Sequence, residues 1–335
     1  DLTIVDANDL TLGDVTATGT LDATAADDLN LDGTIAVDQL TATATSGAIT
    51  QGPDGQLTVL TGPTDLTAGT DITLDSTDND FNGTVNADGR NITLADGTGG
   101  LTLGDVTATG SLDATSTDGP IDQAANTTIA VTGATTLTAS DGGDPATDYD
   151  ITLNGRNNDF GSTVTATGKD LTLVDKNDLT LGDVAATGTL DATAADDLNL
   201  NGTIAVDQLT ATVTSGAITQ DPGGQLTVLT GPTDLTAGTD ITLDAANNDF
   251  NGTVNADGRN ITLADGTGGL TLGDVTATGT LDATSTDGPI DQAANTTIAV
   301  TGATTLTASD GGDPATDYDI TLNGPNNDFG GAVTA

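Results

Sequence analysis

The feature that most constrains this chain is a 15-residue segment that occurs four times. The segment LTLGDVTATGTLDAT begins at Leu10, and copies with at most one substitution begin at three further positions: Leu101, Leu179 and Leu270. Apolar residues alternate with Thr or Asp inside it, which is the period of two that is typical of strands with one buried face. The pairs Gly13-Asp14 and Gly19-Thr20 separate the short triplets and favour sharp bends. Three short strands with bends between them predict one turn of a parallel β-solenoid, in which equivalent strands of successive turns stack into sheets.

Equivalent apolar residues recur at a nearly constant spacing. One series is 19 residues apart, at Leu2, Leu21 and Leu40, and another is 20 apart, at Ile72, Ile92 and Leu112. This spacing suits a coil of three short strands and predicts about 17 turns stacked at about 4.8 Å. We expect these side chains and their copies to point inward: Leu10, Leu12, Val15 and Leu21. We expect these to point outward: Thr11, Thr16 and Asp22.

Composition favours an all-β fold. All 50 acidic residues are Asp, and Thr, Gly, Asp and Asn occupy positions where a helix would favour Glu, Lys, Gln or Arg. With four Phe, two Tyr and no Trp or Met, the interior must be filled by Leu, Ile, Val and Ala. High net charge and few aromatic residues also occur in disordered chains, but the regular apolar alternation outweighs that interpretation. We expect a narrow, uniform core in an elongated rod.

The sequence consists of two near-identical copies. Residues 1–166 match residues 170–335 at 152 of 166 positions, which gives a repeat of 169 residues. We therefore assign one solenoid repeat to 1–169 and a second to 170–335 within one continuous solenoid, and the first divides again into sub-repeats 10–100 and 101–178. Because the second copy stops three residues short, we expect a longer array, continuing in one polypeptide or stacking end to end with other copies of itself.

Charge excludes several partners and activities. The formal net charge of −45, with five basic residues in all, excludes nucleic acid as a natural partner and favours cations. There is no Cys and no apolar segment long enough to span a membrane, so we expect neither disulfides nor membrane insertion. There is also no His or Glu, and every carboxylate cluster belongs to a repeating pattern, so we expect no catalytic residues and no enzyme activity.

Several longer segments resemble a known family. The segments DLTLGDVTATGTLDA, SGAITQ (46–51 and 215–220), TDLTAGTDITLD (64–75 and 233–244) and NNDFGSTVTATGKDLTL (157–173) are similar to the central repeats of filamentous-haemagglutinin-like exoproteins. These are very large secreted bacterial adhesins. The resemblance implies a right-handed parallel β-helix, export by two-partner secretion or a related route, and an extracellular location at the bacterial cell surface as a fibrous stalk or adhesin.

An Asp-rich insertion is the strongest candidate for a metal site. It crowds four carboxylates into ten residues in each copy, and Ca²⁺ favours oxygen ligands on flexible loops. The pattern is neither an EF-hand nor the glycine-rich nonapeptide of calcium-binding toxins, so a solvated acidic loop is the alternative. The candidate calcium ligands are Asp141, Asp144, Asp148 and Asp150 in the first copy and Asp310, Asp313, Asp317 and Asp319 in the second.

Two other patterns have a structural interpretation and a functional one. Asn-Asp-Phe occurs four times, and we interpret Asn and Asp as a corner and Phe as core, with a ligand-contacting stripe as the alternative. Thr-x-Thr pairs such as Thr16 and Thr18 would place hydroxyls in rows, as in ice-binding solenoids, but outward Thr also stacks well in any sheet. The first functional hypothesis is therefore a stalk that supplies length and stiffness. The alternative is a calcium-dependent binding module whose acidic loops and Thr rows contact a glycan, a partner cell or ice.

Overall fold

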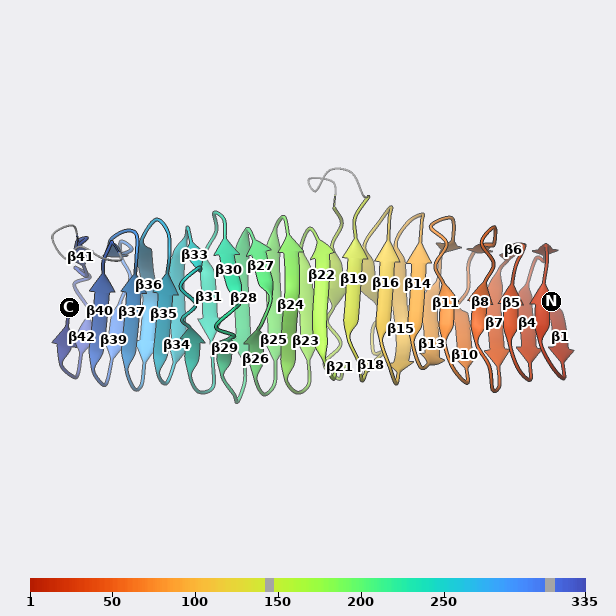
Figure 1. Ribbon diagram of the computed structural model, residues 1–335, viewed down its shortest axis with the longest axis horizontal. Helices are drawn as coiled ribbons and strands as arrows, with labels where there is room; N and C mark the ends of the chain where they lie inside the picture. Colours follow the sequence, from red (N-terminus) through yellow and green to blue (C-terminus); the bar gives the residue numbers. More distant parts are fainter. Residues whose placement is uncertain (142–147, 311–316) are drawn as a thin grey trace. The chain divides into compact units, whose positions relative to one another are not determined.

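The regular structure of this chain consists of short parallel strands. The computed structural model describes residues 1–141, 148–310 and 317–335, and no helix occurs among them. Contacts divide the chain into unit 1, Asp1–Asp175, and unit 2, Lys176–Ala335. Each unit is a parallel β-solenoid, and the two together have about 15 turns of about 20 residues (Figure 1). The boundary between the units lies six residues after the boundary between the sequence copies.

Unit 1 contains β1 to β23. Their bounds are β1 Leu2–Asp6, β2 Leu10–Leu12, β3 Val15–Thr16, β4 Thr20–Ala25, β5 Leu29–Leu31, β6 Thr34–Val37, β7 Gln39–Ala44, β8 Ile49–Gln51, β9 Gln56–Val59, β10 Thr64–Ala68, β11 Ile72–Leu74, β12 Asp80–Phe81, β13 Thr84–Gly89, β14 Ile92–Asp96, β15 Leu101–Ala108, β16 Leu112–Ser116, β17 Ile121–Gln123, β18 Ile129–Val131, β19 Thr135–Ala139, β20 Ile151–Leu153, β21 Asp159–Phe160, β22 Thr163–Gly168 and β23 Leu171–Asp175.

Unit 2 contains β24 to β43. Their bounds are β24 Leu179–Ala186, β25 Thr189–Ala194, β26 Leu198–Leu200, β27 Thr203–Val206, β28 Gln208–Val213, β29 Ile218–Gln220, β30 Gln225–Val228, β31 Thr233–Thr236, β32 Ile241–Leu243, β33 Asp249–Phe250, β34 Thr253–Gly258, β35 Ile261–Asp265, β36 Leu270–Ala277, β37 Leu281–Ser285, β38 Ile290–Gln292, β39 Ile298–Val300, β40 Thr304–Ala308, β41 Ile320–Thr321, β42 Asp328–Phe329 and β43 Val333–Thr334.

The first coils of unit 1 have three sides, each a parallel sheet. The first side pairs β1, β4, β7, β10 and β13 in order, and the second pairs β2, β5, β8, β11 and β14. The third is a four-stranded sheet of β3, β6, β9 and β12. Apolar residues stack on apolar residues, as in the row Leu10, Leu29, Ile49, Ile72, Ile92 and Leu112. The core is therefore a set of Leu, Ile, Val and Ala columns inside the coils.

The predicted alternation of inward and outward residues is confirmed. Leu10, Leu12 and Leu21 are buried, while Thr11 and Thr16 are exposed and Asp22, on the outward face, is half-buried. Val15 is half-buried in the first coil, but its copies are fully buried, at Val106, Val184 and Val275. The third side of the first sub-repeat has four strands, whereas β15, β18 and β21 form three in the second.

Two sequence-based expectations were wrong in detail. Coils between equivalent residues are often longer than 20, for example 23 from Ile49 to Ile72 and 30 from Ile121 to Ile151, so there are about 15 turns and not 17. The Gly-Asp pair is a bend only in the 15-residue segment that begins at Leu10. In the segment that begins at Leu101, β15 continues through Gly104 and Asp105, because these two residues lie opposite Asn86 of β13 in a β-bulge.

Candidate functional site

Short polar side chains at the corners accept hydrogen bonds from the backbone of the next coil. Asp9 Oδ1 accepts from the Asp28 N–H (3.1 Å), and Asp28 Oδ1 accepts from the Ala48 N–H (2.8 Å). The same contact recurs with acceptors 169 residues later, at Asp178 and Asp197. A carboxylate one methylene from the backbone can reach this N–H while its own corner stays tight. Corner chemistry of this kind accounts for a chain rich in Asp without Glu.

Some of these ladders alternate Asp with Asn. Asn86 Nδ2 donates to Asp65 Oδ1 (2.7 Å), and Asn86 Oδ1 accepts from the Asp105 N–H (2.9 Å). Asp105 Oδ1 in turn accepts from the Thr128 N–H (2.8 Å). An amide between two carboxylates separates like charges and supplies a donor as well as an acceptor. The ladder is repeated in unit 2 by Asp234, Asn255, Asp274 and Thr297.

Arg90 and its copy Arg259 each neutralise a corner carboxylate, and Lys169 Nζ lies 3.3 Å from Asp170 Oδ2 and 3.8 Å from Asp150 Oδ1. Arg90 holds Asp71 through Nε (2.9 Å) and Nη2 (2.8 Å), and Asn91 Nδ2 also donates to Asp71 Oδ1 (3.0 Å). The hydrogen bonds from Arg90 lower the pKa of Asp71 to about 2. The copy of this cluster joins Arg259 to Asp240 in the same way. Both clusters are partly exposed, so they organise a corner and add little to stability.

The Asn-Asp-Phe motif is a buried junction between coils. Asn79 is fully buried and forms a reciprocal amide pair with Gln51, with Gln51 Nε2 donating to Asn79 Oδ1 (2.6 Å) and Asn79 Nδ2 donating to Gln51 Oε1 (3.1 Å). Asn79 Oδ1 also accepts from the Leu57 N–H (3.0 Å). The pair is repeated in the other three motifs: Gln123 with Asn158, Gln220 with Asn248, and Gln292 with Asn327. The Asn that the sequence predicted at a corner therefore joins two coils through buried hydrogen bonds.

The Phe of the motif ends the third side of its coil stack. Phe81 is 1% exposed, and β12, to which it belongs, is the last strand of the sheet formed with β9, β6 and β3. Its N–H donates to Asp96 Oδ2 (2.8 Å), so a carboxylate from the following coil replaces the missing strand carbonyl. Asp175 and Asp265 accept from Phe160 and Phe250 in the same way. The core position predicted for Phe is confirmed for Phe81, Phe160 and Phe250, whereas Phe329 is half-buried.

Burial raises the pKa of two of the carboxylates that accept the Phe N–H, Asp96 and Asp265. Desolvation raises the pKa of Asp96 to about 6, and the nearby charge of Asp80 adds to the shift, against the backbone N–H groups of Phe81 and Thr98, which lower it. Asp265 has its pKa raised to about 6 for the same reasons, with Asp249 as the neighbouring charge. Desolvation therefore favours the protonated form of these two carboxyl groups, which makes them sensitive to pH near 6.

The predicted calcium ligands are only partly within the described residues. Asp144 and Asp313 lie outside them. Asp141, Asp150, Asp310, Asp317 and Asp319 are exposed, whereas Asp148 is buried at 7% exposure. Within residues 1–141, 148–310 and 317–335, no three acidic side chains gather in a geometry that would hold a metal ion. Calcium binding by the insertions stays a prediction.

A tyrosine holds the base of each insertion. The Tyr149 hydroxyl donates to Asp118 Oδ1 (3.0 Å), and Tyr318 makes the same contact with Asp287 (3.0 Å). The hydrogen bond to Asp118 raises the pKa of Tyr149 above its usual value. The insertion is therefore tied at its C-terminal side to a loop 31 residues earlier in the chain.

Outward Thr residues form rows, but other residues interrupt them. On the second side of unit 1 the outward row contains Thr11, Asn30, Thr50, Thr73, Thr93, Asp113 and Thr136. Only three successive coils, from Thr50 to Thr93, present Thr without a break. Hydroxyl rows this short suit ordinary cross-strand stacking.

Sequence reasoning missed the partners of the motifs. Gln51 and Asn79 are 28 residues apart, and Gln123 and Asn158 are 35 apart, so no fixed spacing links them. A usable signal was the Gln that closes SGAITQ and PIDQ, because Gln is rare in this sequence and ends an inward-facing triplet.

No helix of the described residues is long and apolar enough to cross a membrane.

Comparison with known proteins places the chain in a repeat family. A family model described as repeats of unknown function (DUF5649) matches residues 1–39, 24–88, 89–167, 168–208, 193–257 and 258–335. Matches beginning at 24 and 193, and at 89 and 258, are offset by the same 169 residues as the sequence copies. No curated protein and no solved structure matches the chain. Because the matched segments together cover residues 1–335, the chain belongs to the DUF5649 family of repeats, which here form a β-solenoid.

Proposed function

We propose that this chain is a repetitive stalk segment of an extracellular fibre or cell-surface adhesin, where it supplies length and stiffness. The observation that carries the proposal is the repetition of whole junctions. The corner ladders, the Gln-Asn pair and the Phe-to-Asp contact recur in both copies with the same partners. Selection for a single reactive site would normally produce one place that differs from its copies.

The distribution of side chains supports a structural role over catalysis. The two carboxylates whose pKa is raised to about 6 are used by the fold, since Asp96 and Asp265 accept the backbone N–H groups of Phe81 and Phe250. The outward rows consist mainly of Thr, Asp and Asn, whose polar side chains face water. A surface with this composition keeps a highly charged chain soluble and separated from its neighbours.

The similarity to central repeats of filamentous-haemagglutinin-like exoproteins supports a bacterial cell-surface location. In that setting the partner of one repeat is another repeat of the same kind, within one polypeptide or in a neighbouring chain. The 152 identities between the copies support this inference, because a coil surface that stacks on its own copy needs the same columns and ladders on both sides.

The proposal is tested by measuring how size grows with repeat number. Proteins with one, two and four 169-residue repeats are compared by small-angle X-ray scattering. A stiff stalk gives a maximum dimension that rises in proportion to repeat number. Repeats joined by flexible hinges give a rise close to the square root of repeat number, and that result would refute the spacer role.

A further inference from the structure

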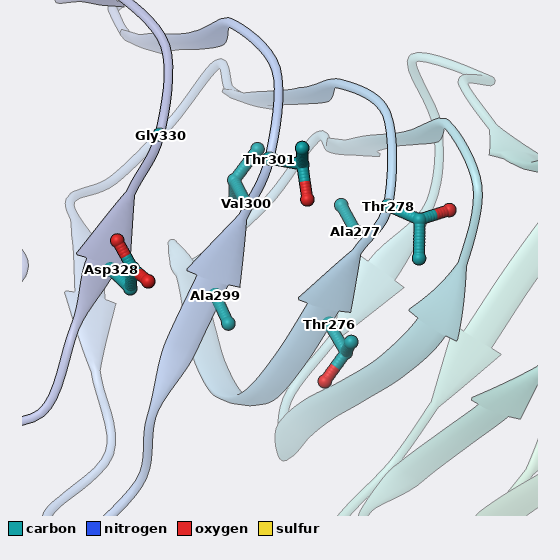
Figure 2. A pocket seen from close by; sticks show the side chains of 8 residues that line it. All are labelled: Thr276, Ala277, Thr278, Ala299, Val300, Thr301, Asp328 and Gly330. Carbon is teal, nitrogen blue, oxygen red and sulfur yellow. The ribbon is translucent and has the colours of Figure 1, made fainter.

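A small surface hollow occurs at the same place in each unit. Its volume is about 300 Å³ in unit 1 and about 220 Å³ in unit 2. Figure 2 shows the second hollow, which opens over the strands β36, β39 and β42. The outward residues around it are Thr276, Thr278, Ala299, Thr301, Asp328 and Gly330.

The hollow exists because two small residues interrupt the outward rows. Thr276, Ala299 and Asp328 are paired in register on the three strands, so an alanine methyl lies between a hydroxyl and a carboxylate (Figure 2). Two residues further along each strand, at the next outward position, Thr301 lies beside Gly330 of the next coil, which has no side chain. Rows on adjacent coils are about 4.8 Å apart, so the missing side chains open a space about two coils wide.

The chemistry of the lining is that of a site for a neutral polyol. The Ala299 methyl offers an apolar floor, three Thr hydroxyls can donate or accept, and the Asp328 carboxylate accepts from hydroxyl donors. A pyranose ring has the matching pattern, with a face of C–H groups and a rim of hydroxyls. The formal net charge of −45 opposes an anionic ligand. In the described parts of the chain, no group of three acidic residues is placed to hold a metal ion instead.

Size limits the ligand further. A volume of 220 to 300 Å³ is at or below the lower end of small-molecule sites, which is about 300 Å³. The hollow thus accommodates one ring, not an extended chain lying along the groove. The hollow of unit 1, formed by residues such as Thr107, Ala130 and Asp159, has the same side chains as the hollow of unit 2.

We propose that each hollow binds one pyranose unit of a neutral glycan, with the ring over Ala130 or Ala299 and its hydroxyls donating to Asp159 or Asp328. This inference goes beyond the spacer role, which needs no ligand. Two shallow sites on one chain bind weakly one at a time and gain strength when a multivalent glycan surface engages both.

The test uses saturation-transfer NMR on the 335-residue chain with three probes: methyl α-D-mannopyranoside, methyl β-D-galactopyranoside and methyl β-D-glucopyranoside. We expect transfer to the C–H protons of at least one probe at millimolar concentration. The double variant Ala130→Leu/Ala299→Leu fills both hollows and should reduce that transfer at least tenfold. The double variant Asp159→Asn/Asp328→Asn should weaken it, because a neutral amide accepts less strongly than a carboxylate.

The matched control is Ala36→Leu/Ala205→Leu, which adds the same atoms at outward alanines of β6 and β27. The control should leave the transfer unchanged, and all variants should keep the circular dichroism spectrum of the parent. No transfer with any probe would overturn the proposal, as would transfer that survives filling of the hollows. Equal transfer to methyl β-D-glucopyranosiduronate would refute the selectivity for neutral rings. None of these outcomes affects the scattering test of the spacer role.

Discussion

Asp side chains lie on successive corners, and several of them, such as Asp9 and Asp28, accept a backbone hydrogen bond that offsets the repulsion between them. Two carboxylates about 4.8 Å apart repel by about 1 kcal/mol in a water-like dielectric. A hydrogen bond to a charged acceptor contributes about 1.5 to 3 kcal/mol. The contact from the Asp28 N–H to Asp9 is of this type, and Asn86 between Asp65 and Asp105 removes part of the repulsion altogether.

The buried junction carboxylates predict that stability depends on pH in a defined window. Asp96 and Asp265 have folded-state pKa values of about 6, above the unfolded value of 3.8. The native state therefore binds more protons than the unfolded state between about pH 4 and 6, and stability should fall as pH rises through that range. The pKa of Asp71 is lowered to about 2, so its contribution to stability is present above pH 3.8 and is lost only as the pH falls from 3.8 toward 2.

Urea unfolding at a series of pH values checks this prediction. The double variant Asp96→Asn/Asp265→Asn should show a flatter profile between pH 4 and 6, because an amide oxygen still accepts the Phe N–H but does not titrate. The exposed pair Asp27→Asn/Asp196→Asn is the matched control. An unchanged slope in the junction variant would show that the pH dependence comes from the overall charge.

Three buried threonines predict a gain in stability. The hydroxyl oxygens of Thr135, Thr233 and Thr304 are buried without a hydrogen-bond partner in the described structure. Val has the same shape and removes the unsatisfied hydroxyl, so Thr233→Val should raise the free energy of unfolding by about 1 kcal/mol. The outward Thr236→Val is the control and should change stability by less than about 0.5 kcal/mol. A loss of stability in Thr233→Val would mean that the hydroxyl is satisfied, for instance by water.

At the scale of strands and junctions, the sequence predicted the alternation well and the long-range partners poorly. Leu10, Leu12 and Leu21 follow from a period of two, because a strand leaves one face for the core. The pairing of Gln51 with Asn79 did not follow, since loops of varying length separate the two side chains. The β-bulge at Asn86 was also missed, because the same LTLGDV segment bends in one context and pairs straight in another.

The Gln-Asn pair should be the most costly polar contact to remove. Asn248→Ala leaves the Leu226 N–H and the Gln220 amide without their partner in a buried site. A loss of about 2 to 4 kcal/mol in the free energy of unfolding is expected from the unsatisfied groups and the cavity. Asn251→Ala, on the exposed side of the same junction, is the control. Equal effects of the two substitutions in urea unfolding would contradict the role of the buried pair.

At the scale of the whole molecule, charge sets the expected response to ions. Only five basic residues oppose the 50 Asp carboxylates, which leaves a formal net charge of −45, so sodium chloride should raise the melting temperature by screening. If the Asp141 to Asp150 insertions bind Ca²⁺, millimolar calcium should raise it further at constant ionic strength. The double variant Asp144→Asn/Asp313→Asn should remove only the calcium effect. Equal melting temperatures in calcium and in chelator would rule out specific calcium sites.

The central claim, that successive coils stack as parallel strands in register, is tested most directly by cross-linking. The chain has no Cys, so each introduced pair is observed alone. Thr73 and Thr93 are outward neighbours on β11 and β14, and a disulfide spans Cα atoms about 4.4 to 6.8 Å apart. Thr73→Cys/Thr93→Cys should therefore oxidise rapidly within one chain, whereas Thr73→Cys/Thr115→Cys, two coils apart and out of register, should stay reduced. Rapid oxidation of the second pair, or none of the first, would contradict the solenoid.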